Sequence, residues 1–333
     1  LVALDCKGLE PFFAIHPWPR VRYAASTRHA AAAMTIRLLA ATALLALLCA
    51  CGGGATNHPA APPIAAAWFY LADTHDYQNI PDEWRQVSFD KVDVLYVGPG
   101  GIQDGNRFGF HESAGTGRLA HRFEWLVETA RRDNPDIKIV VSQWWGQGQG
   151  IWGRPLAALD GEAALQAYAQ SVGDFIAHYQ TYAGGRYAID GFDIDYEDNN
   201  VTPRFPALAA RLGATLKALS ARYGKPLRLT LSPADGSYLD RASLAPFDYI
   251  NMQSYAGGMD IPPDAFLAQG VPARKILYGI CPETNCDSFS TAQVLATYRR
   301  YGLAGVHLWR LNSDNHAHEG QVQAAIHAGL HHP

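Results

Sequence analysis

The chain has 333 residues, 48% of them hydrophobic, so it is long enough to build one or two domains around a large buried core. Its formal net charge of −4 excludes the strongly basic surface that nucleic-acid binding requires. We therefore expect no nucleic-acid partner.

The first distinct segment, residues 34–51, has the layout of an export signal. Residues 34–37 form a short positive start, and 38–50 form an apolar run too short to span a bilayer comfortably. The run ends Leu-Cys-Ala-Cys and resembles a bacterial lipobox, whose last cysteine carries the lipid. We expect 1–33 to be an over-extended gene start, 34–50 a signal peptide and Cys51 the lipidated residue. Mass spectrometry of the mature N-terminus would test this.

This segment also predicts the location of the protein. A lipidated Cys51 places the chain in the bacterial cell envelope, where Gly52 favours the outer membrane, and loss of the anchor would leave it secreted. We expect that lipid to be its one contact with a membrane and the protein to be a monomer. Residues 51–64, rich in Ala and Pro, are typical of a tether.

From residue 65 to 333 short apolar runs alternate with helical patterns. Eight strands are predicted, at 65–71, 92–97, 137–142, 188–196, 227–232, 248–254, 275–280 and 304–309. Helices are predicted at 119–132, 161–179, 206–223, 290–301 and 319–330, with shorter ones at 81–88, 239–245 and 263–269. Asp160 is placed to cap the helix at 161, and Ser290 with Gln293 forms a capping box.

Strands that alternate with helices pair in parallel through crossovers. Eight of them in this length predict the α/β class and a single (β/α)8 TIM barrel. A doubly wound open sheet is the alternative, but no GxGxxG or P-loop follows any predicted strand.

The most informative strand reads Asp-Gly-Phe-Asp-Ile-Asp-Tyr-Glu over 190–197. Because strand side chains alternate, Asp193, Asp195 and Glu197 share one face, which we expect to point into the barrel. Carboxylates that close together in a low-dielectric interior cannot all ionise easily, so at least one should hold a proton near neutral pH. Glu197 lies nearest the carboxyl-terminal rim, where barrel enzymes keep their active sites, and is the natural proton donor.

This segment matches the motif D-G-x-D-x-D-x-E of glycoside hydrolase family 18, and we note the resemblance on Asp190, Gly191, Asp193, Asp195 and Glu197. Other strands agree: Gln253 and Tyr255 resemble the sixth-strand motif of that family, Ser142 its third strand and Trp309 the end of its eighth. Two features depart from the family pattern. The third strand continues Gln-Trp-Trp-Gly, and Ala256 stands where many members carry Asp or Asn.

The resemblance implies a substrate-assisted, retaining mechanism with no cofactor. Glu197 would protonate the leaving oxygen, and the 2-acetamido group of the substrate would attack the anomeric carbon. Asp195 would orient and stabilise that group, Tyr255 would donate a hydrogen bond to it, and Asp193 would share a proton with Asp195. The implied partner is a glycan containing N-acetylglucosamine.

Several aromatic and polar side chains are predicted to bind the sugar. Trp309 and Gln253 follow from the resemblance, and Tyr70 ends the first predicted strand. Trp144, Trp145 and Trp152 lie in a Gly-rich loop over 143–153 that we expect at the same rim. Packing beneath that loop is an equal alternative for these tryptophans. Asp190 and Gly191 are interpreted as structural rather than catalytic.

Two cysteines remain beyond the signal region. Cys281 and Cys286 are separated by four residues, which permits a local disulfide in an exported protein, although two free thiols are an alternative. No CxxC or HExxH motif occurs, and the thirteen histidines show no ligand spacing, so no metal site is predicted.

Two functions stay open at this point. The first is an endo-glycosidase that hydrolyses β-1,4 linkages next to N-acetylglucosamine, in chitin or in the core of N-glycans. The second is a non-catalytic lectin-like barrel that binds the same sugar, because a fold does not fix a function. Barrels of the second kind usually lack the acid, and Glu197 is present, which favours the enzyme.

Overall fold

The structure of the protein is a computed structural model that describes residues 61–72, 76–113, 117–145, 153–197 and 200–332. The chain divides into Leu1–Pro59 and Ala60–Pro333, and all described residues belong to the second unit. The predicted gene start, signal peptide, Cys51 and most of the tether therefore lie outside the described residues. No helix among the residues searched has the length and apolar character that crossing a membrane requires.

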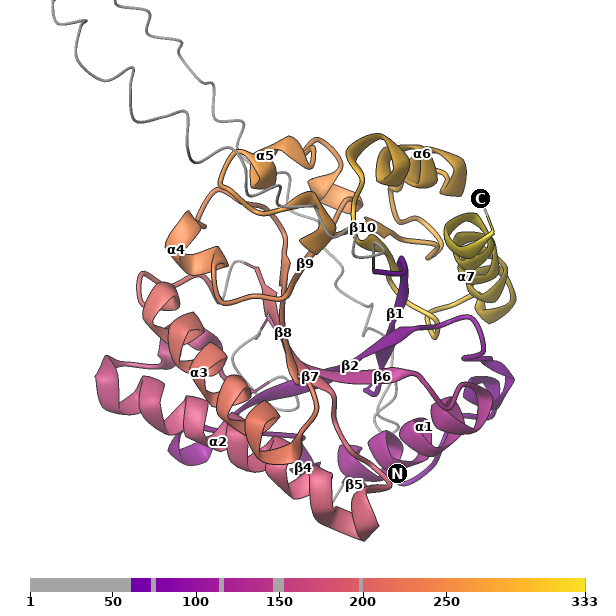
Figure 1. The fold of residues 1–333 in the computed structure, drawn as a ribbon. Helices are drawn as coiled ribbons and strands as arrows, with labels where there is room; N and C mark the ends of the chain where they lie inside the picture. The colour runs from indigo at the N-terminus through magenta and orange to yellow at the C-terminus, as the bar shows by residue number, and fades with distance from the viewer. Residues whose placement is uncertain (1–60, 73–75, 114–116, 146–152, 198–199, 333) are drawn as a thin grey trace, which may run out of the picture. The chain divides into compact units, whose positions relative to one another are not determined.

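Eight parallel strands close into a barrel, as predicted (Figure 1). Each strand pairs with the next along the chain, and the first also pairs with the last. The barrel strands are β1 (Ile64–Tyr70), β2 (Val94–Gln103), β6 (Lys138–Gln143), β7 (Gly191–Tyr196), β8 (Arg228–Pro233), β9 (Tyr249–Met252), β10 (Ile276–Ile280) and β11 (Gly305–Leu308). All eight lie where the sequence predicts them.

Helices surround the strands (Figure 1). They are α1 (Leu119–Asp133), α2 (Gly161–Thr181), α3 (Phe205–Tyr223), α4 (Arg241–Leu244), α5 (Asp264–Leu267), α6 (Thr291–Tyr301) and α7 (His316–His331). The helical pattern predicted at 81–88 is a 3₁₀ helix over Asp82–Gln86. The sequence analysis missed three short strands, β3 (Arg107–Gly109), β4 (Glu112–Ser113) and β5 (Gly117–Arg118), all of which pair antiparallel.

The two predicted helix caps differ in outcome. Ser290 and Gln293 form the expected capping box at the start of α6. Asp160 occupies the N-cap position of α2, but its side chain makes no capping hydrogen bond. Its carboxylate instead lies 2.8 Å from the guanidinium of Arg204, so the prediction that Asp160 caps the helix was wrong because an ion pair competes for the side chain.

Strand alternation separates two apolar regions. Phe192, Ile194 and Tyr196 of β7 belong to the large core between the barrel and its helices. A smaller cluster includes Trp68 and Tyr96, which are partners in strand register and face the same side as Asp193. The acidic side chains of β7 therefore point into the barrel, and the apolar ones point toward the helices.

Candidate active site

The acidic residues lie at the carboxyl-terminal end of β7. Asp193 and Asp195 are 0% and 4% exposed, and Glu197, just beyond the end of the strand, is half-buried. The carboxylates rise from the barrel interior toward its rim in the order that strand alternation predicts. The rim is where barrel enzymes bind substrate, so this is the candidate active site.

Asp193, the deepest carboxylate, is held by neutral groups from three other strands. It accepts hydrogen bonds from the hydroxyls of Ser142 at 2.8 Å, Thr230 at 2.6 Å and Ser232 at 3.0 Å, and from the Asn251 amide at 3.3 Å. Burial raises the pKa of Asp193 to about 6, and the hydroxyl donors oppose that rise. Asp193 thus titrates close to neutral pH.

Asp195 and Glu197 form a pair joined by Gln253. The Gln253 amide nitrogen lies 3.1 Å from an oxygen of Asp195 and 2.9 Å from an oxygen of Glu197. Burial raises the pKa of Asp195 well above its usual range, and the neighbouring charges of Glu197 and Asp193 raise it further. A hydrogen bond with Glu197 raises the pKa of Asp195 as well, so the two carboxyl groups do not both ionise easily.

Tyr255 follows β9 and is 8% exposed. Burial, followed by the charges of Asp195 and Glu197, raises the pKa of its hydroxyl well above 10, so the hydroxyl keeps its proton. The ring has room because position 279 on β10 is glycine: a Cβ there would meet Tyr255 at 2.8 Å and the Met252 carbonyl oxygen at 2.4 Å. Tyr255 is thus a hydrogen-bond donor close to the carboxylate pair.

A rigid polar and aromatic layer lies beneath the site. The His307 Nε2 donates to the Met252 carbonyl at 2.8 Å, and Nδ1 accepts from the Trp68 indole at 3.3 Å. Burial lowers the pKa of His307 to about 4, so the imidazole is neutral. Trp68 stacks on Tyr96, whose hydroxyl donates to Asn251 at 3.0 Å. This network fixes the amide that contacts Asp193.

Aromatic rings gather at the rim. Trp144 lies 4.9 Å from Tyr70 and 5.9 Å from Trp309, measured between ring centroids. The Trp309 ring also packs 5.5 Å from Trp68. Four of the predicted aromatic residues therefore meet in one group, since Trp145 packs 6.5 Å from Trp144. Trp152 lies outside the described residues.

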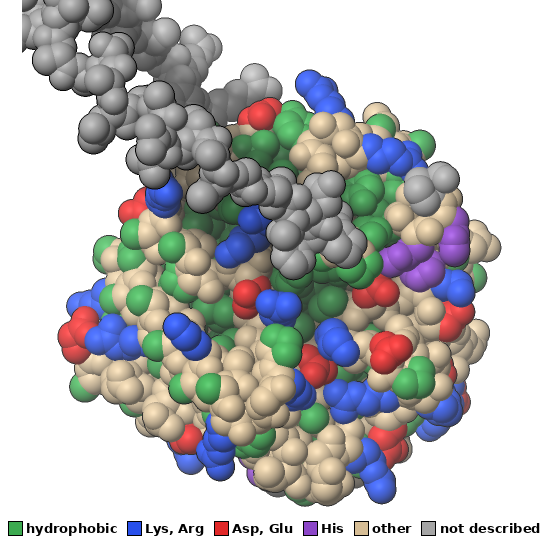
Figure 2. Space-filling model, in the orientation of Figure 1, with side chains coloured by type: hydrophobic (Ala, Val, Ile, Leu, Met, Phe, Trp, Pro, Cys, Tyr) green, Lys and Arg blue, Asp and Glu red, His purple; other side chains and the backbone are tan. Residues whose placement is uncertain are grey.

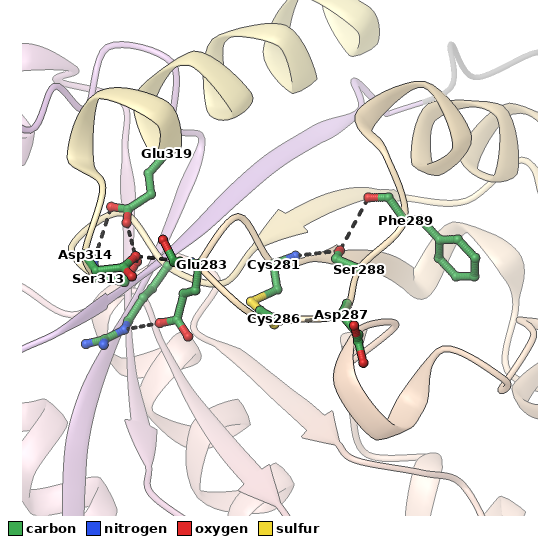
Figure 3. Close-up of a disulfide and its surroundings, with 11 residues drawn as sticks. Cys281, Glu283, Cys286, Asp287, Ser288, Phe289, Ser313, Asp314 and Glu319 are labelled. Atoms are coloured by element: carbon green, nitrogen blue, oxygen red, sulfur yellow. Dashed lines mark hydrogen bonds and ion pairs between the residues drawn. A yellow bond between two sulfur atoms is a disulfide. The ribbon is translucent and has the colours of Figure 1, made fainter. Parts of the chain in front are cut away.

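Arg310 and Glu283 extend this group. The Arg310 guanidinium carbon lies 5.1 Å above the Tyr70 ring and 5.9 Å from the Trp309 ring. Its Nε donates to the Glu283 carboxylate at 2.8 Å. Glu283 belongs to the loop closed by the disulfide between Cys281 and Cys286, whose Cα atoms are 6.1 Å apart (Figure 3). The bridge thus restrains a loop that contacts the rim.

Asp190 and Gly191 lie at the opposite end of β7. Asp190 pairs with Lys225 at 2.9 Å and Arg131 at 3.3 Å, and it accepts the backbone N–H of Ile139 at 3.1 Å. A Cβ at Gly191 would stand 2.6 Å from the Arg228 carbonyl oxygen of the neighbouring strand. Ion pairs and close backbone packing, rather than polar groups of the rim, therefore surround these two residues.

Sequence reasoning missed several residues of the site: Thr230, Ser232, Asn251, Tyr96, His307, Glu283 and Arg310. Each is an ordinary strand or loop residue in the sequence, and none belongs to the eight-residue motif. For the five that lie inside predicted strands the one signal is position, because polar residues there have to face the interior of the barrel or its ends. Glu283 and Arg310 lie in loops and carry no such signal.

No protein-family model and no curated protein matches the chain. Solved structures do match. A glycoside hydrolase family 18 chitinase from Flavobacterium johnsoniae superposes with a TM-score of 0.59 and 16% identity, covering 81% of this chain and 94% of its own. A family 18 N-acetylglucosaminidase from Paenibacillus barengoltzii gives 0.57 and 17%, covering 80% and 100%. A family 18 chitinase from Cycas revoluta, in complex with (GlcNAc)3, gives 0.55 and 17%, covering 78% and 98%. At these identities the likeness establishes the barrel fold.

Proposed function

We propose that the protein is a retaining, substrate-assisted endo-glycosidase that hydrolyses β-1,4 linkages next to N-acetylglucosamine. The observation that carries the proposal is the carboxyl pair of Asp195 and Glu197, which Gln253 joins at a barrel rim that also carries the rings of Trp309 and Trp144. Aromatic faces suit the apolar faces of sugar rings. Solved neighbours that are chitinases, one bound to (GlcNAc)3, favour β-1,4-linked N-acetylglucosamine oligomers over N-glycan cores.

In the proposed mechanism, a single proton on the pair of Asp195 and Glu197 serves both catalytic steps. With the proton on Glu197, that residue gives it to the oxygen of the scissile bond. The bond between C1 and that oxygen breaks while the carbonyl oxygen of the substrate 2-acetamido group bonds to C1, which yields an oxazolinium ion. Asp195 is then an anion beside that cation, and its charge stabilises the intermediate.

The second half of the reaction restores the enzyme. Glu197, now a carboxylate, takes a proton from a water molecule whose oxygen attacks C1 and reopens the oxazolinium ring. Two displacements at C1 give net retention. Tyr255 donates to the acetamido oxygen, and Gln253 holds both carboxyl groups in place. Asp193 tunes the charge of Asp195 through the field between them.

Hydrolysis of a chito-oligosaccharide and of a high-mannose glycoprotein, assayed in parallel, tests this proposal. We expect the wild type to cleave the chito-oligosaccharide and Glu197→Gln to lose about 10²–10⁴ in kcat, because the amide keeps the shape but has no proton to transfer. Glu128→Gln, at an exposed ion pair with Arg186, is the matched control and should retain full activity. Equal rates for Glu197→Gln and wild type would remove Glu197 from the mechanism. Binding of the sugar with no cleavage by the wild type would instead favour the lectin-like function.

A further inference from the structure

Three potential metal ligands meet where the last helix packs beside the start of the barrel. Asp93 lies directly before β2, and His327 and His331 lie on α7. One ligand atom from each residue falls within 4.8 Å of the other two. All three side chains are half-buried, so they are both positioned and reachable from solvent. Figure 2 shows histidine side chains at the surface on the side where α7 lies in Figure 1.

The two histidines are one helical turn apart, at positions i and i+4. Side chains at this spacing lie on the same helix face, and paired histidines so placed are zinc ligands in other proteins. Their ring centroids are 4.4 Å apart. From the sequence alone no ligand spacing is expected among the histidines, because this pair lacks the intervening glutamate of HExxH and the third ligand lies 234 residues earlier in the chain.

The third ligand is held firmly in place. An Asp93 oxygen accepts the backbone N–H of Ala65 at 2.7 Å and lies 3.1 Å from His331 Nε2. Gln323, one turn before His327 and 2% exposed, donates to the Lys91 carbonyl at 2.8 Å and fixes α7 against the segment that carries Asp93. The cluster therefore joins two separately anchored parts of the barrel.

A salt bridge between Asp93 and His331 would explain only two of the three residues. It gives no reason for a second imidazole within reach of the same carboxylate. Two imidazole nitrogens and a carboxylate oxygen are the donor set that Zn²⁺ prefers, with bonds of about 2.1 Å and neighbouring ligands therefore roughly 3.4 Å apart. The observed separation of 3.1 Å between His331 and Asp93 is close to that value.

We propose that Asp93, His327 and His331 bind a zinc ion that fastens the last helix to the first two strands. The site lies at the amino-terminal end of the strands, opposite the carboxylate pair, so it does not depend on the proposed glycosidase activity. Its effect is structural, because the ion binds the folded chain and stabilises it by mass action.

Calorimetric titration with ZnCl₂, together with thermal unfolding, tests the proposal. We expect saturable one-to-one binding by the wild type and a midpoint that rises by about 3–6 °C at saturating zinc. His327→Ala should abolish both effects, and it leaves the bonds of Asp93 to Ala65 and His331 intact. His318→Ala, an exposed histidine on the same helix, is the matched control and should bind zinc like the wild type.

Two outcomes would overturn the proposal. One is a wild type that shows no saturable zinc binding. The other is a His327→Ala variant that binds zinc as tightly as the wild type, which would place the ion on other histidines. Since His327 has no contact with the carboxylate pair among the described interactions, hydrolysis by His327→Ala should be unchanged in metal-free buffer. The failure of this proposal is thus distinguishable from failure of the proposed function.

Discussion

Aspartates have different surroundings at the two ends of the barrel. At the amino-terminal end, Asp93, Asp190 and Asp248 each precede a strand. Each accepts a backbone N–H from the start of the neighbouring strand, at Ala65, Ile139 and Leu229. All three also lie beside a basic side chain, belonging to His331, Lys225 and Arg131, and Arg228 respectively.

At the carboxyl-terminal end, Asp193 and Asp195 are deeper, and their hydrogen-bond donors are hydroxyls and amides. Burial raises the pKa of both carboxyl groups there. The surroundings of an aspartate, and not its residue type, therefore decide its role. A basic partner and a backbone N–H make it a clamp between strands, whereas burial among neutral donors makes it a group that exchanges protons.

We expect the largest effect from replacing an aspartate by asparagine at either end of β7, because one change should lower activity and the other stability. Asp195→Asn should lower kcat by about 10²–10³, because the oxazolinium ion loses its countercharge. Its stability should equal or exceed that of the wild type, since a buried acid that is costly to ionise becomes neutral. Asp190→Asn should keep kcat but lose about 1–2 kcal/mol of unfolding free energy with its two ion pairs.

Steady-state hydrolysis and urea unfolding of both variants measure this separation. A loss of activity without a loss of stability in Asp190→Asn would contradict the proposed difference between the two ends. Full activity of Asp195→Asn would contradict it as well.

The second prediction concerns pH and Asp193. Its pKa is about 6 in the folded protein and near 3.8 in an unfolded chain, so the folded state binds the proton more tightly. Stability must then fall as pH rises from about 4 to about 6, by about 3 kcal/mol for this group alone. This loss of unfolding free energy is absent below about pH 4 and complete above about pH 6.

Urea unfolding of the wild type and Asp193→Asn at both ends of this window checks the prediction. The variant should lose that part of the pH dependence, and it should be the more stable protein near neutral pH. Because the raised pKa of Asp195 acts in the same direction, the informative quantity is the difference between wild type and variant. Parallel pH profiles for the two proteins would contradict the assignment.

The sequence predicted what depends on local periodicity. The eight barrel strands, and the inward face of Asp193, Asp195 and Glu197, follow from alternation along the chain. Asp193 and its donor Thr230 lie 37 residues apart, and its donor Asn251 lies 58 residues away. Contacts between strands join segments far apart in the chain, and the alternation within one strand does not identify the partner residue on the next.

Gln253 illustrates that limit. The sequence analysis assigned it to the sugar, and the structure places its amide between Asp195 and Glu197. The Asp160 cap was wrong for a similar reason, since its partner Arg204 lies 44 residues away. Ala256, noted as a departure from the family pattern, has φ of +47°, a left-handed conformation that Asn and Asp adopt more easily than Ala.

We expect the smallest effect from replacing Ala256 by glycine. Ala256 follows Tyr255 at the functional end, and Ala183, at φ +50°, lies in the 3₁₀ helix Tyr182–Gly185 that follows α2. A left-handed conformation costs alanine about 1–2 kcal/mol in the folded state. Glycine removes this strain, but the higher entropy of its unfolded chain offsets part of the gain in stability. Ala256→Gly and Ala183→Gly should therefore each raise the unfolding free energy by about 0.5 kcal/mol. Only Ala256→Gly should also lower kcat, by a few-fold at most, because it loosens the backbone that positions the Tyr255 hydroxyl. Thermal unfolding and steady-state hydrolysis of both variants measure this, and an equal kcat for the two would mean that the conformation of residue 256 is irrelevant to the site.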